Sequence, residues 1–356
     1  MEIRDRPVGF AIFGLGRAGT IHFKNVVANH RAAVRWIIEE DVETANRTVK
    51  QYFLDDTRVV DSRGMAAVLG DNRVDAVIVC TPTHTHEKIV RAALKAGKSV
   101  FCEKPIAATI ESVQSCYDDA EKYNRVLYCA FNRRFDPATR NINHRVKAGE
   151  IGQLQQIKVI SRELFPPVAY LKVSGGIFHD SSVHDLDKVC WIVGESPSMV
   201  YAQGHAFNAD VAAMNDIDTV AIVMKFPCGV LAHIDISRHA SYGYDQRLEV
   251  FGSKGMLETH NTRPYEVTSH VSAGTVDDKI HTSFVERYDQ SYKLELEHFL
   301  DILTGKETQV EITSKDTILC SLLAEACSQS YKQGKPIHII NERMVNDNDN
   351  IIGHEL

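Results

Sequence analysis

The chain has 356 residues, which is too long for one ordinary hydrophobic core and suits two domains. Hydrophobic residues make up 44% of the sequence and charged residues 24%, which are ordinary values for a globular protein and do not indicate disorder. The formal net charge of −7 offers no basic surface, which argues against nucleic acid or anionic lipid as a partner.

Nothing in the sequence predicts a membrane segment. No apolar run approaches the roughly 20 residues that cross a bilayer, and the first residues do not resemble a secretory signal. The eight cysteines are scattered, and several fall in apolar strand contexts where a reduced thiol behaves as a small hydrophobe. We therefore expect a cytoplasmic protein.

The first part of the chain, residues 1–130, alternates short β-branched runs with stretches of helical period. This alternation predicts a doubly wound, Rossmann-type parallel sheet whose ligand crevice lies at the carboxyl ends of its strands. The expected strands are Val8–Phe13, Val34–Glu40, Val59–Val60, Val74–Cys80, Ser99–Cys102 and Val126–Ala130.

In the second part, residues 131–340, expected strands follow one another with little helix between them. In Val230–Ser237, apolar residues alternate with polar ones, which indicates a half-buried strand of an antiparallel sheet. We expect an α+β domain with a mostly antiparallel open sheet, covered by helices on one face and by another subunit on the other. The remaining residues, 341–356, are expected to form a polar tail. The other expected strands are Leu154–Ile160, Met199–Phe207, Thr219–Phe226 and Leu248–Phe251.

A glycine-rich loop follows the first expected strand and opens a helix. Its residues Gly14, Gly16 and Gly19 have the GxGxxG spacing, and an acidic residue lies about 20 positions further on. The first glycine permits a tight turn, the second lets the backbone approach a pyrophosphate, and the third allows close packing of helix on strand. The loop predicts a dinucleotide site, which we favour over a turn without ligand.

Three acids end the second expected strand: Glu39, Glu40 and Asp41. A carboxylate at this place accepts hydrogen bonds from the adenine ribose hydroxyls and repels a 2′-phosphate. NAD is therefore favoured over NADP. Strand register decides which acid faces the ribose, and we predict Glu40.

Several strings together resemble the glucose–fructose oxidoreductase and inositol dehydrogenase family, and within it the myo-inositol 2-dehydrogenases. The resemblance spans roughly residues 8–340. It is carried by the glycine loop, by Thr81-Pro82 with His86, and by the strings Phe101–Pro105, Ser174–Asp180, His184-Asp185, Tyr242–Arg247, Phe251–Gly255 and Glu286–Tyr288.

The resemblance implies the site residues. It implies that Lys104 touches both cofactor and substrate, and that Asp180 and His184 complete the catalytic set. It implies Arg134, Tyr244 and Tyr288 as groups that bind substrate hydroxyls. The implied cofactor contacts are Gly14, Gly16, Arg17, Ala18, Gly19, Glu40, Thr81, Pro82, His86, Glu103 and Lys104.

Oxidation of a secondary alcohol requires removal of the hydroxyl proton while hydride leaves the carbon. A neutral imidazole suits the base, and we predict His184, with Lys104 stabilising the developing alkoxide. The two roles can also be exchanged. Asp180 lies four residues before His184 and can orient the imidazole, bind a neighbouring hydroxyl, or serve as the N-cap of the helix that follows.

The histidines His84, His86 and His179 invite a zinc interpretation, but their spacing matches no tight ligand set, and we expect no metal. The sequence thus predicts an NAD-dependent, homo-oligomeric dehydrogenase of a cyclic polyol, with myo-inositol as leading substrate. The alternatives are a dehydrogenase of another sugar, scyllo-inositol or a dihydrodiol, and a catalytically silent NAD-binding regulator.

Overall fold

The computed structural model describes residues 6–345, and the chain forms two compact units. Of the described residues, the first unit contains 6–132 together with Gln290–Ile318. The second contains Arg133–Asp289 and residues 319–345. The segment 290–318, which the sequence placed in the second domain, therefore belongs to the first unit.

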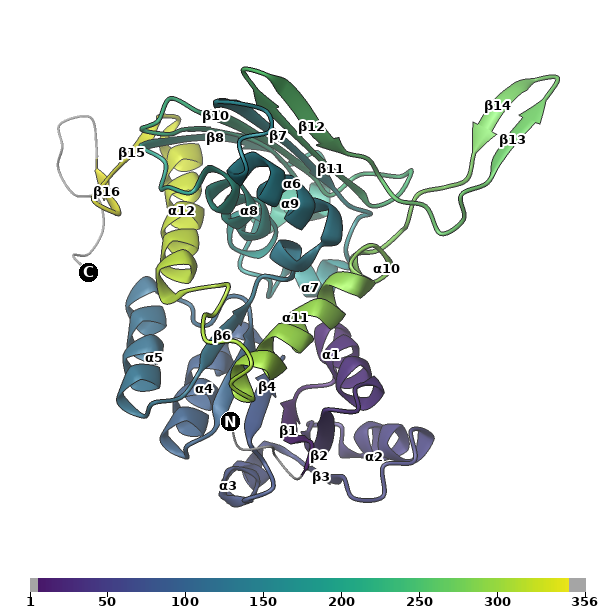
Figure 1. Cartoon of the computed structure of the whole chain (residues 1–356), viewed down its shortest axis with the longest axis vertical. Coiled ribbons are helices and arrows are strands. Elements are labelled where there is room, and N and C mark those ends of the chain that lie inside the picture. The colour runs from purple at the N-terminus through teal and green to yellow at the C-terminus, as the bar shows by residue number, and fades with distance from the viewer. Residues whose placement is uncertain (1–5, 346–356) are drawn as a thin grey trace. The chain divides into compact units, whose positions relative to one another are not determined.

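The first unit is built on a six-stranded parallel sheet with the strand order β3-β2-β1-β4-β5-β6 (Figure 1). This order confirms the predicted doubly wound sheet. The strands are β1 (Val8–Phe13), β2 (Ala32–Ile38), β3 (Arg58–Val60), β4 (Ala76–Val79), β5 (Ser99–Glu103) and β6 (Leu127–Ala130). The helices of this part are α1 (Arg17–Ala28), α2 (Val42–Gln51), α3 (Met65–Gly70), α4 (His86–Lys95) and α5 (Ile110–Lys122).

Helix α11 (Asp289–Leu303) joins the first unit because its apolar face continues the core of the parallel sheet. Phe299 is fully buried, and its ring centroid lies 6.3 Å from that of Phe10, 5.5 Å from that of Phe101 and 5.6 Å from that of Tyr128. Burying an aromatic side chain of this kind contributes about 1.5–3 kcal/mol. The position of this helix late in the sequence therefore does not show to which domain it belongs.

The second unit is built on an eight-stranded sheet with the order β12-β11-β7-β10-β9-β8-β15-β16. Only the β7–β10 pair is parallel within the described sheet, which confirms the predicted mostly antiparallel open sheet. Its strands are β7 (Leu154–Arg162), β8 (Met199–His205), β9 (Thr219–Lys225), β10 (Leu231–Ser237), β11 (Asp245–Gly252), β12 (Gly255–Thr259), β15 (Ile337–Ile340) and β16 (Arg343–Val345).

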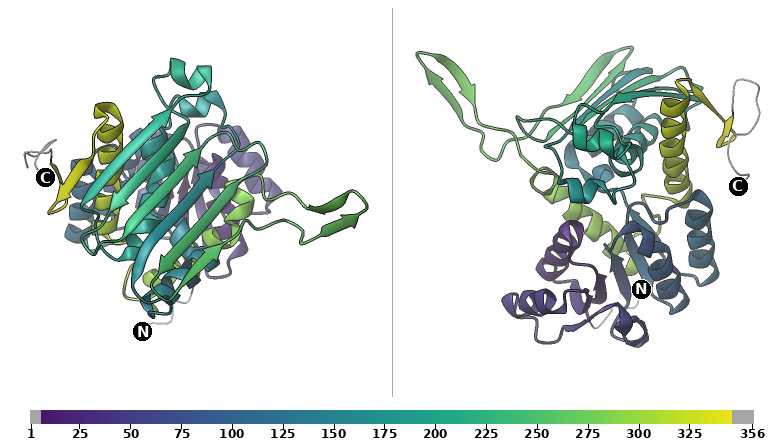
Figure 2. Two further views of the ribbon diagram at one scale, coloured as in Figure 1. Left: turned by 90° about the horizontal axis from the view of Figure 1, so that it is seen from above. Right: turned by 180° about the vertical axis from the view of Figure 1, so that it is seen from behind.

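Helices cover one face of this sheet, and no other element of residues 6–345 covers the second face, which is called the open face below (Figure 2, left). The covering elements include α6 (Pro137–Lys147), α8 (Val183–Val193) and the second half of α12 (Ser314–Gln333). Every second residue of β10 is buried, as the alternating sequence predicts. Val223, Leu231, Phe251 and Met256 are exposed. The register of the strands places these four side chains on the open face.

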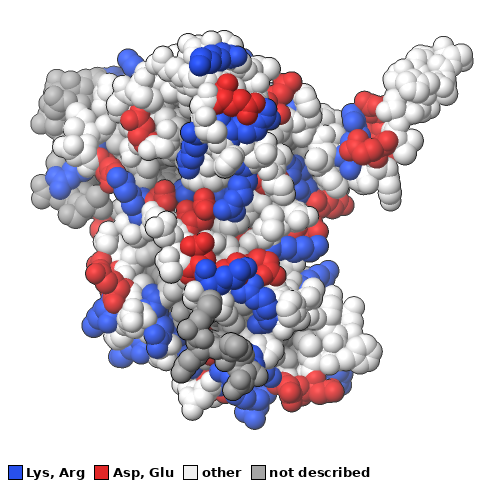
Figure 3. Space-filling model, viewed as in Figure 1, with Lys and Arg blue, Asp and Glu red and all other residues white. Residues whose placement is uncertain are grey.

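A hairpin of β13 (Thr268–Val271) and β14 (Gly274–Asp277) extends beyond the β12 edge of this sheet (Figures 1 and 2). All residues of both strands are exposed. The tip of the hairpin bears no Lys, Arg, Asp or Glu (Figure 3).

The three remaining short helices are α7 (Val168–Leu171), α9 (Ala209–Ala213) and α10 (Phe284–Arg287). The predicted polar tail begins later than expected, because Arg343–Val345 pair with β15 as β16; its residues 346–356 lie outside the described part. Within residues 6–345, no helix combines the length and the apolarity needed to cross a bilayer.

Candidate active site

The glycine loop joins β1 to α1 and has the geometry that a pyrophosphate requires. Gly14 has a φ of +88°, and a Cβ there would lie 2.9 Å from the carbonyl oxygen of Cys80. A Cβ on Gly19 would lie 2.0 Å from the carbonyl oxygen of Gly14, so helix and loop can approach only with glycine at this position. A Cβ on Gly16 would meet nothing within 4 Å, which leaves space for a phosphate at the helix N-terminus.

The carboxylate beside this loop belongs to Glu39, whereas the sequence predicted Glu40. Strand β2 ends at Ile38, two residues earlier than expected, so Glu39 is the first residue beyond the strand. Its Oε2 accepts a hydrogen bond of 2.7 Å from the backbone N–H of Leu15 in the glycine loop. The side chain of Glu40 is exposed, and Asp41 caps α2.

Lys104 follows β5 at the carboxyl edge of the same sheet, as predicted. The preceding carboxylate, Glu103, lies 2.8 Å from Nε2 of the fully buried His22 on α1. Burial alone would raise the pKa of Glu103, but its hydrogen bond to His22 lowers it below the ordinary value. His22 was not predicted, and it connects the helix of the glycine loop to the residue before Lys104.

His86, predicted as a cofactor contact, is instead a buried link between two loops. Its Nδ1 lies 2.8 Å from the carbonyl oxygen of Pro105, and its Nε2 lies 2.7 Å from that of Thr81. The side chain is only 2% exposed, and burial lowers its pKa. Because each ring nitrogen contacts a main-chain carbonyl, His86 links the Thr81-Pro82 loop to the turn that contains Lys104 and Pro105.

In the second unit, Asp180 lies in a π-helical turn, Phe178–Ser182, that runs directly into α8 and His184. Turns of this kind are frequent at functional sites. The turn is continuous with the helix, so Asp180 is not its N-cap. The Asp180 carboxylate instead accepts hydrogen bonds from the hydroxyl of Tyr170 at 2.7 Å and from Nη2 of Arg238 at 3.0 Å.

The two predicted tyrosines come together around an arginine that was not predicted. The rings of Tyr244 and Tyr288 meet edge to face, with centroids 6.1 Å apart. The guanidinium of Arg133 lies 5.4 Å from the Tyr288 ring centroid, and its Nη2 is 3.4 Å from the Tyr244 hydroxyl. Burial raises the pKa of Tyr244, so its hydroxyl stays protonated and can both donate and accept hydrogen bonds.

Arg134, predicted to bind substrate, is instead held in a structural ion pair. It is 2% exposed, and its Nε and Nη2 bind the carboxylate of Asp187 at 2.6–3.1 Å. The guanidinium also lies 5.7 Å from the ring centroid of Trp191. Neighbouring residues of the 3₁₀ turn Asn132–Phe135 point about 120° apart, so Arg133 and Arg134 face different surroundings.

Two of the three histidines considered as zinc ligands have other partners. His179 lies 3.4 Å from Glu325, and His86 is bound to two carbonyls as described above. Among residues 6–345, no group of three or more His, Cys, Asp or Glu side chains is placed to hold a metal ion.

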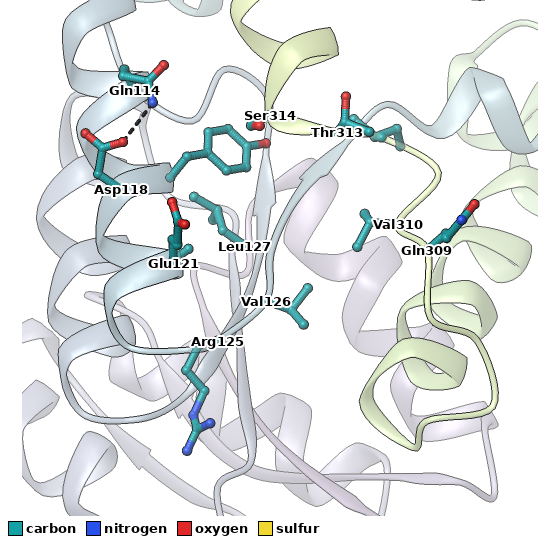
Figure 4. Close-up of a pocket in the computed structure, with 13 residues that line it drawn as sticks. Gln114, Asp118, Glu121, Arg125, Val126, Leu127, Gln309, Val310, Thr313 and Ser314 are labelled. Carbon is teal, nitrogen blue, oxygen red and sulfur yellow. Dashed lines mark hydrogen bonds between the residues drawn. The ribbon is translucent and has the colours of Figure 1, made fainter.

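A separate cavity of about 580 Å³ lies in the first unit between α5, β6 and the segment 309–314 (Figure 4). Gln114 on its wall donates a hydrogen bond of 2.8 Å to Asp118. Its lining contains neither the glycine loop nor Lys104. It is therefore not the cofactor site.

Two known family domains match the chain. Residues 8–131 match the oxidoreductase family with an NAD-binding Rossmann fold, and residues 139–258 match the GFO/IDH/MocA C-terminal domain. The myo-inositol 2-dehydrogenase of Thermotoga maritima is 34% identical over 330 residues, which cover 92% of this chain and 97% of that protein.

Solved structures agree with the sequence matches. A myo-inositol dehydrogenase from Corynebacterium glutamicum has a TM-score of 0.87 at 36% identity and covers 94% of this chain and 99% of its own. The scyllo-inositol dehydrogenase of Lactobacillus casei with bound NAD(H) and scyllo-inositol has a TM-score of 0.84 at 25% identity, with coverage of 94% and 99%. These matches confirm the predicted resemblance, the fold class and NAD as the cofactor. The chain belongs to the GFO/IDH/MocA family of NAD-binding oxidoreductases.

Proposed function

We propose that the protein is an NAD-dependent dehydrogenase that oxidises one secondary hydroxyl of a cyclic polyol, with myo-inositol as leading substrate. The observation that carries this proposal is the Asp180–His184 segment, in which a carboxylate fixed by Tyr170 and Arg238 precedes an imidazole by one helical turn. The retention of Lys104 after β5 supports it, since a protein that only senses NAD needs no such set. The names of the inositol dehydrogenases reported above support the substrate class.

The chain's residues have distinct roles in this proposal. Bound NAD supplies the hydride acceptor. His184 takes the hydroxyl proton, while the Lys104 ammonium donates a hydrogen bond to the reacting oxygen. Asp180 accepts a hydrogen bond from a neighbouring hydroxyl, and Tyr244 and Tyr288 bind further hydroxyls. Arg134 has no part in this site, because its guanidinium is buried and binds the Asp187 carboxylate.

A substrate panel tests the function. We expect NADH formation with myo-inositol, and the panel includes scyllo-inositol, hexoses and a dihydrodiol, which represent the alternative enzymes. Turnover with a hexose or the dihydrodiol but no inositol would place the protein among those alternatives. Clear NAD binding by fluorescence titration without turnover of any polyol would favour the silent regulator.

We propose that Glu39, rather than Glu40, binds the adenine ribose. Replacing Glu39 by serine removes a charged acceptor and the repulsion of a 2′-phosphate. The ratio of kcat/KM for NAD to that for NADP should fall about 10–100-fold, as expected for one charge-assisted hydrogen bond of about 1.5–3 kcal/mol. Glu40→Ser is the matched control and should leave the ratio within about twofold. The opposite pattern would return the role to Glu40.

We propose a homo-oligomer, a dimer or tetramer, that buries the open face of the eight-stranded sheet. Light scattering should give a multiple of 39.9 kDa. Leu231→Asp should lower that mass, because it puts an unpaired charge on the covered face. Phe53→Asp is the control, since Phe53 is 86% exposed on the first unit. A mass of one chain for the wild type at micromolar concentration would contradict this proposal.

We also propose that the protein works in the cytoplasm. Eight cysteines suit a reducing compartment. Burial raises the pKa of the Cys102 and Cys327 thiols, which keeps them in the unreactive protonated form.

A further inference from the structure

Arg238 directly follows β10 and is surrounded by three carboxylates. Its side chain is fully buried. Its Nη2 lies 3.0 Å from Asp180, its Nη1 lies 3.5 Å from Asp216, and its Nε lies 3.5 Å from Glu163. A buried arginine needs charged partners, and here each guanidinium nitrogen lies within 3.5 Å of a different carboxylate.

This arrangement fixes the plane of the guanidinium. Arginine presents its donors in a rigid fork, so partners on three sides prevent rotation about the terminal bonds. Asp216 has a second contact, because its Oδ1 accepts a hydrogen bond of 3.3 Å from the backbone N–H of Ile177. Ile177 immediately precedes the π-helical turn with Asp180, so the cluster holds both the Asp180 carboxylate and the backbone that carries it.

The Asp180 carboxylate is thereby held on two sides, by Arg238 at Oδ2 and by the Tyr170 hydroxyl at Oδ1. A carboxylate has about four acceptor positions, so these two bonds are compatible with a substrate hydroxyl bound at the same time. The Asp180 side chain is 12% exposed, so part of it is accessible to solvent.

Building on the proposed function, we propose that Arg238 is a positioning residue that holds the Asp180 carboxylate oriented to accept a hydrogen bond from a polyol hydroxyl. Lysine in place of Arg238 keeps the positive charge but loses the planar fork of donors. The Arg238→Lys variant therefore tests the orientation of Asp180 separately from the charge beside it. A purely structural ion pair would affect folding, and its effect on catalysis would not depend on Asp180.

A double-mutant cycle tests this dependence. For Arg238→Lys, kcat/KM for the polyol should fall about 10–100-fold, mostly through KM, the loss expected when a charge-assisted hydrogen bond is misaligned. In an Asp180→Asn background, the same substitution should change kcat/KM by less than about twofold, because the group that Arg238 positions has lost its charge. The rise of kcat with pH should persist in Arg238→Lys, since His184 remains.

Arg145→Met is the matched control, because Arg145 forms an exposed ion pair with Glu150 in the same unit. It should leave kcat/KM unchanged in both backgrounds. Polyol binding to the NADH complex, measured by calorimetry, gives the same cycle without turnover, and thermal unfolding of each variant shows that it folds.

Additive effects of the Arg238 and Asp180 substitutions in a wild type that oxidises polyols would overturn the Arg238 inference alone. Absence of turnover and of polyol binding in the wild type would overturn the proposed function and this inference together.

Discussion

Replacing His184 by alanine is expected to lower turnover of the polyol by about 10²–10⁴, the usual loss when a general base is removed. KM for the polyol should change little, because the proton acceptor acts mainly in the transition state. NAD affinity should also be unchanged, since the glycine loop and Glu39 are untouched. Steady-state kinetics and a fluorescence titration with NAD measure these quantities separately.

The pH dependence of activity tests whether His184 is the base. The base must be neutral to accept a proton, so wild-type activity should rise with pH as the imidazole deprotonates, and this rise should vanish in His184→Ala. His179→Ala is the matched control, because His179 lies in the π-helical turn just before α8 and is partly exposed beside Glu325. A His184→Ala variant that keeps the pH rise and shows mainly a higher KM would make Lys104 the base.

The sequence predicted the two sheets well because their patterns are local. The alternation of strand and helix up to residue 130 and the period of two in Val230–Ser237 each reflect the burial of their own element. The GxGxxG spacing likewise encodes a turn in which Gly19 lies so close to the carbonyl of Gly14, five residues earlier, that only glycine fits. For such features, the neighbours in sequence are also the neighbours that matter in space.

The sequence does not decide a role that depends on strand register or on distant packing. Glu39 and Glu40 differ by one residue in a strand end, and alternate positions of a strand face opposite sides. Arg133 and Arg134 are neighbours with the same charge, and only the tertiary structure decides their contacts. Arg133 contacts the two tyrosines, and Arg134 binds Asp187.

Buried partners were missed for the same reason. His22 lies between apolar residues of α1, and its pairing with Glu103 spans 81 residues. Arg238 meets Asp180 across 58 residues, and a single arginine after a strand carries no sign of the carboxylates that will surround it. For His22, the local sign of such a site is a polar side chain between two apolar residues, because burial obliges it to find a partner.

Lys104→Ala should differ from His184→Ala in kind. The ammonium donates to the reacting oxygen in both the bound substrate and the transition state, so its loss should raise KM for the polyol as well as lower kcat. Removal of one such donor typically costs about 10²–10³ in kcat. Lys95→Ala, at the end of α4 in the same unit, is the control and should leave both constants unchanged.

Lys104→Arg sharpens this test, because it keeps the charge and changes only the shape and reach of the donor. We expect it to restore part of the substrate affinity and little of the turnover. Thermal unfolding of each variant checks that it folds. A Lys104→Ala enzyme with normal KM and reduced kcat alone would contradict ground-state contact. Loss of the pH-dependent rise in that enzyme would identify the lysine as the proton acceptor.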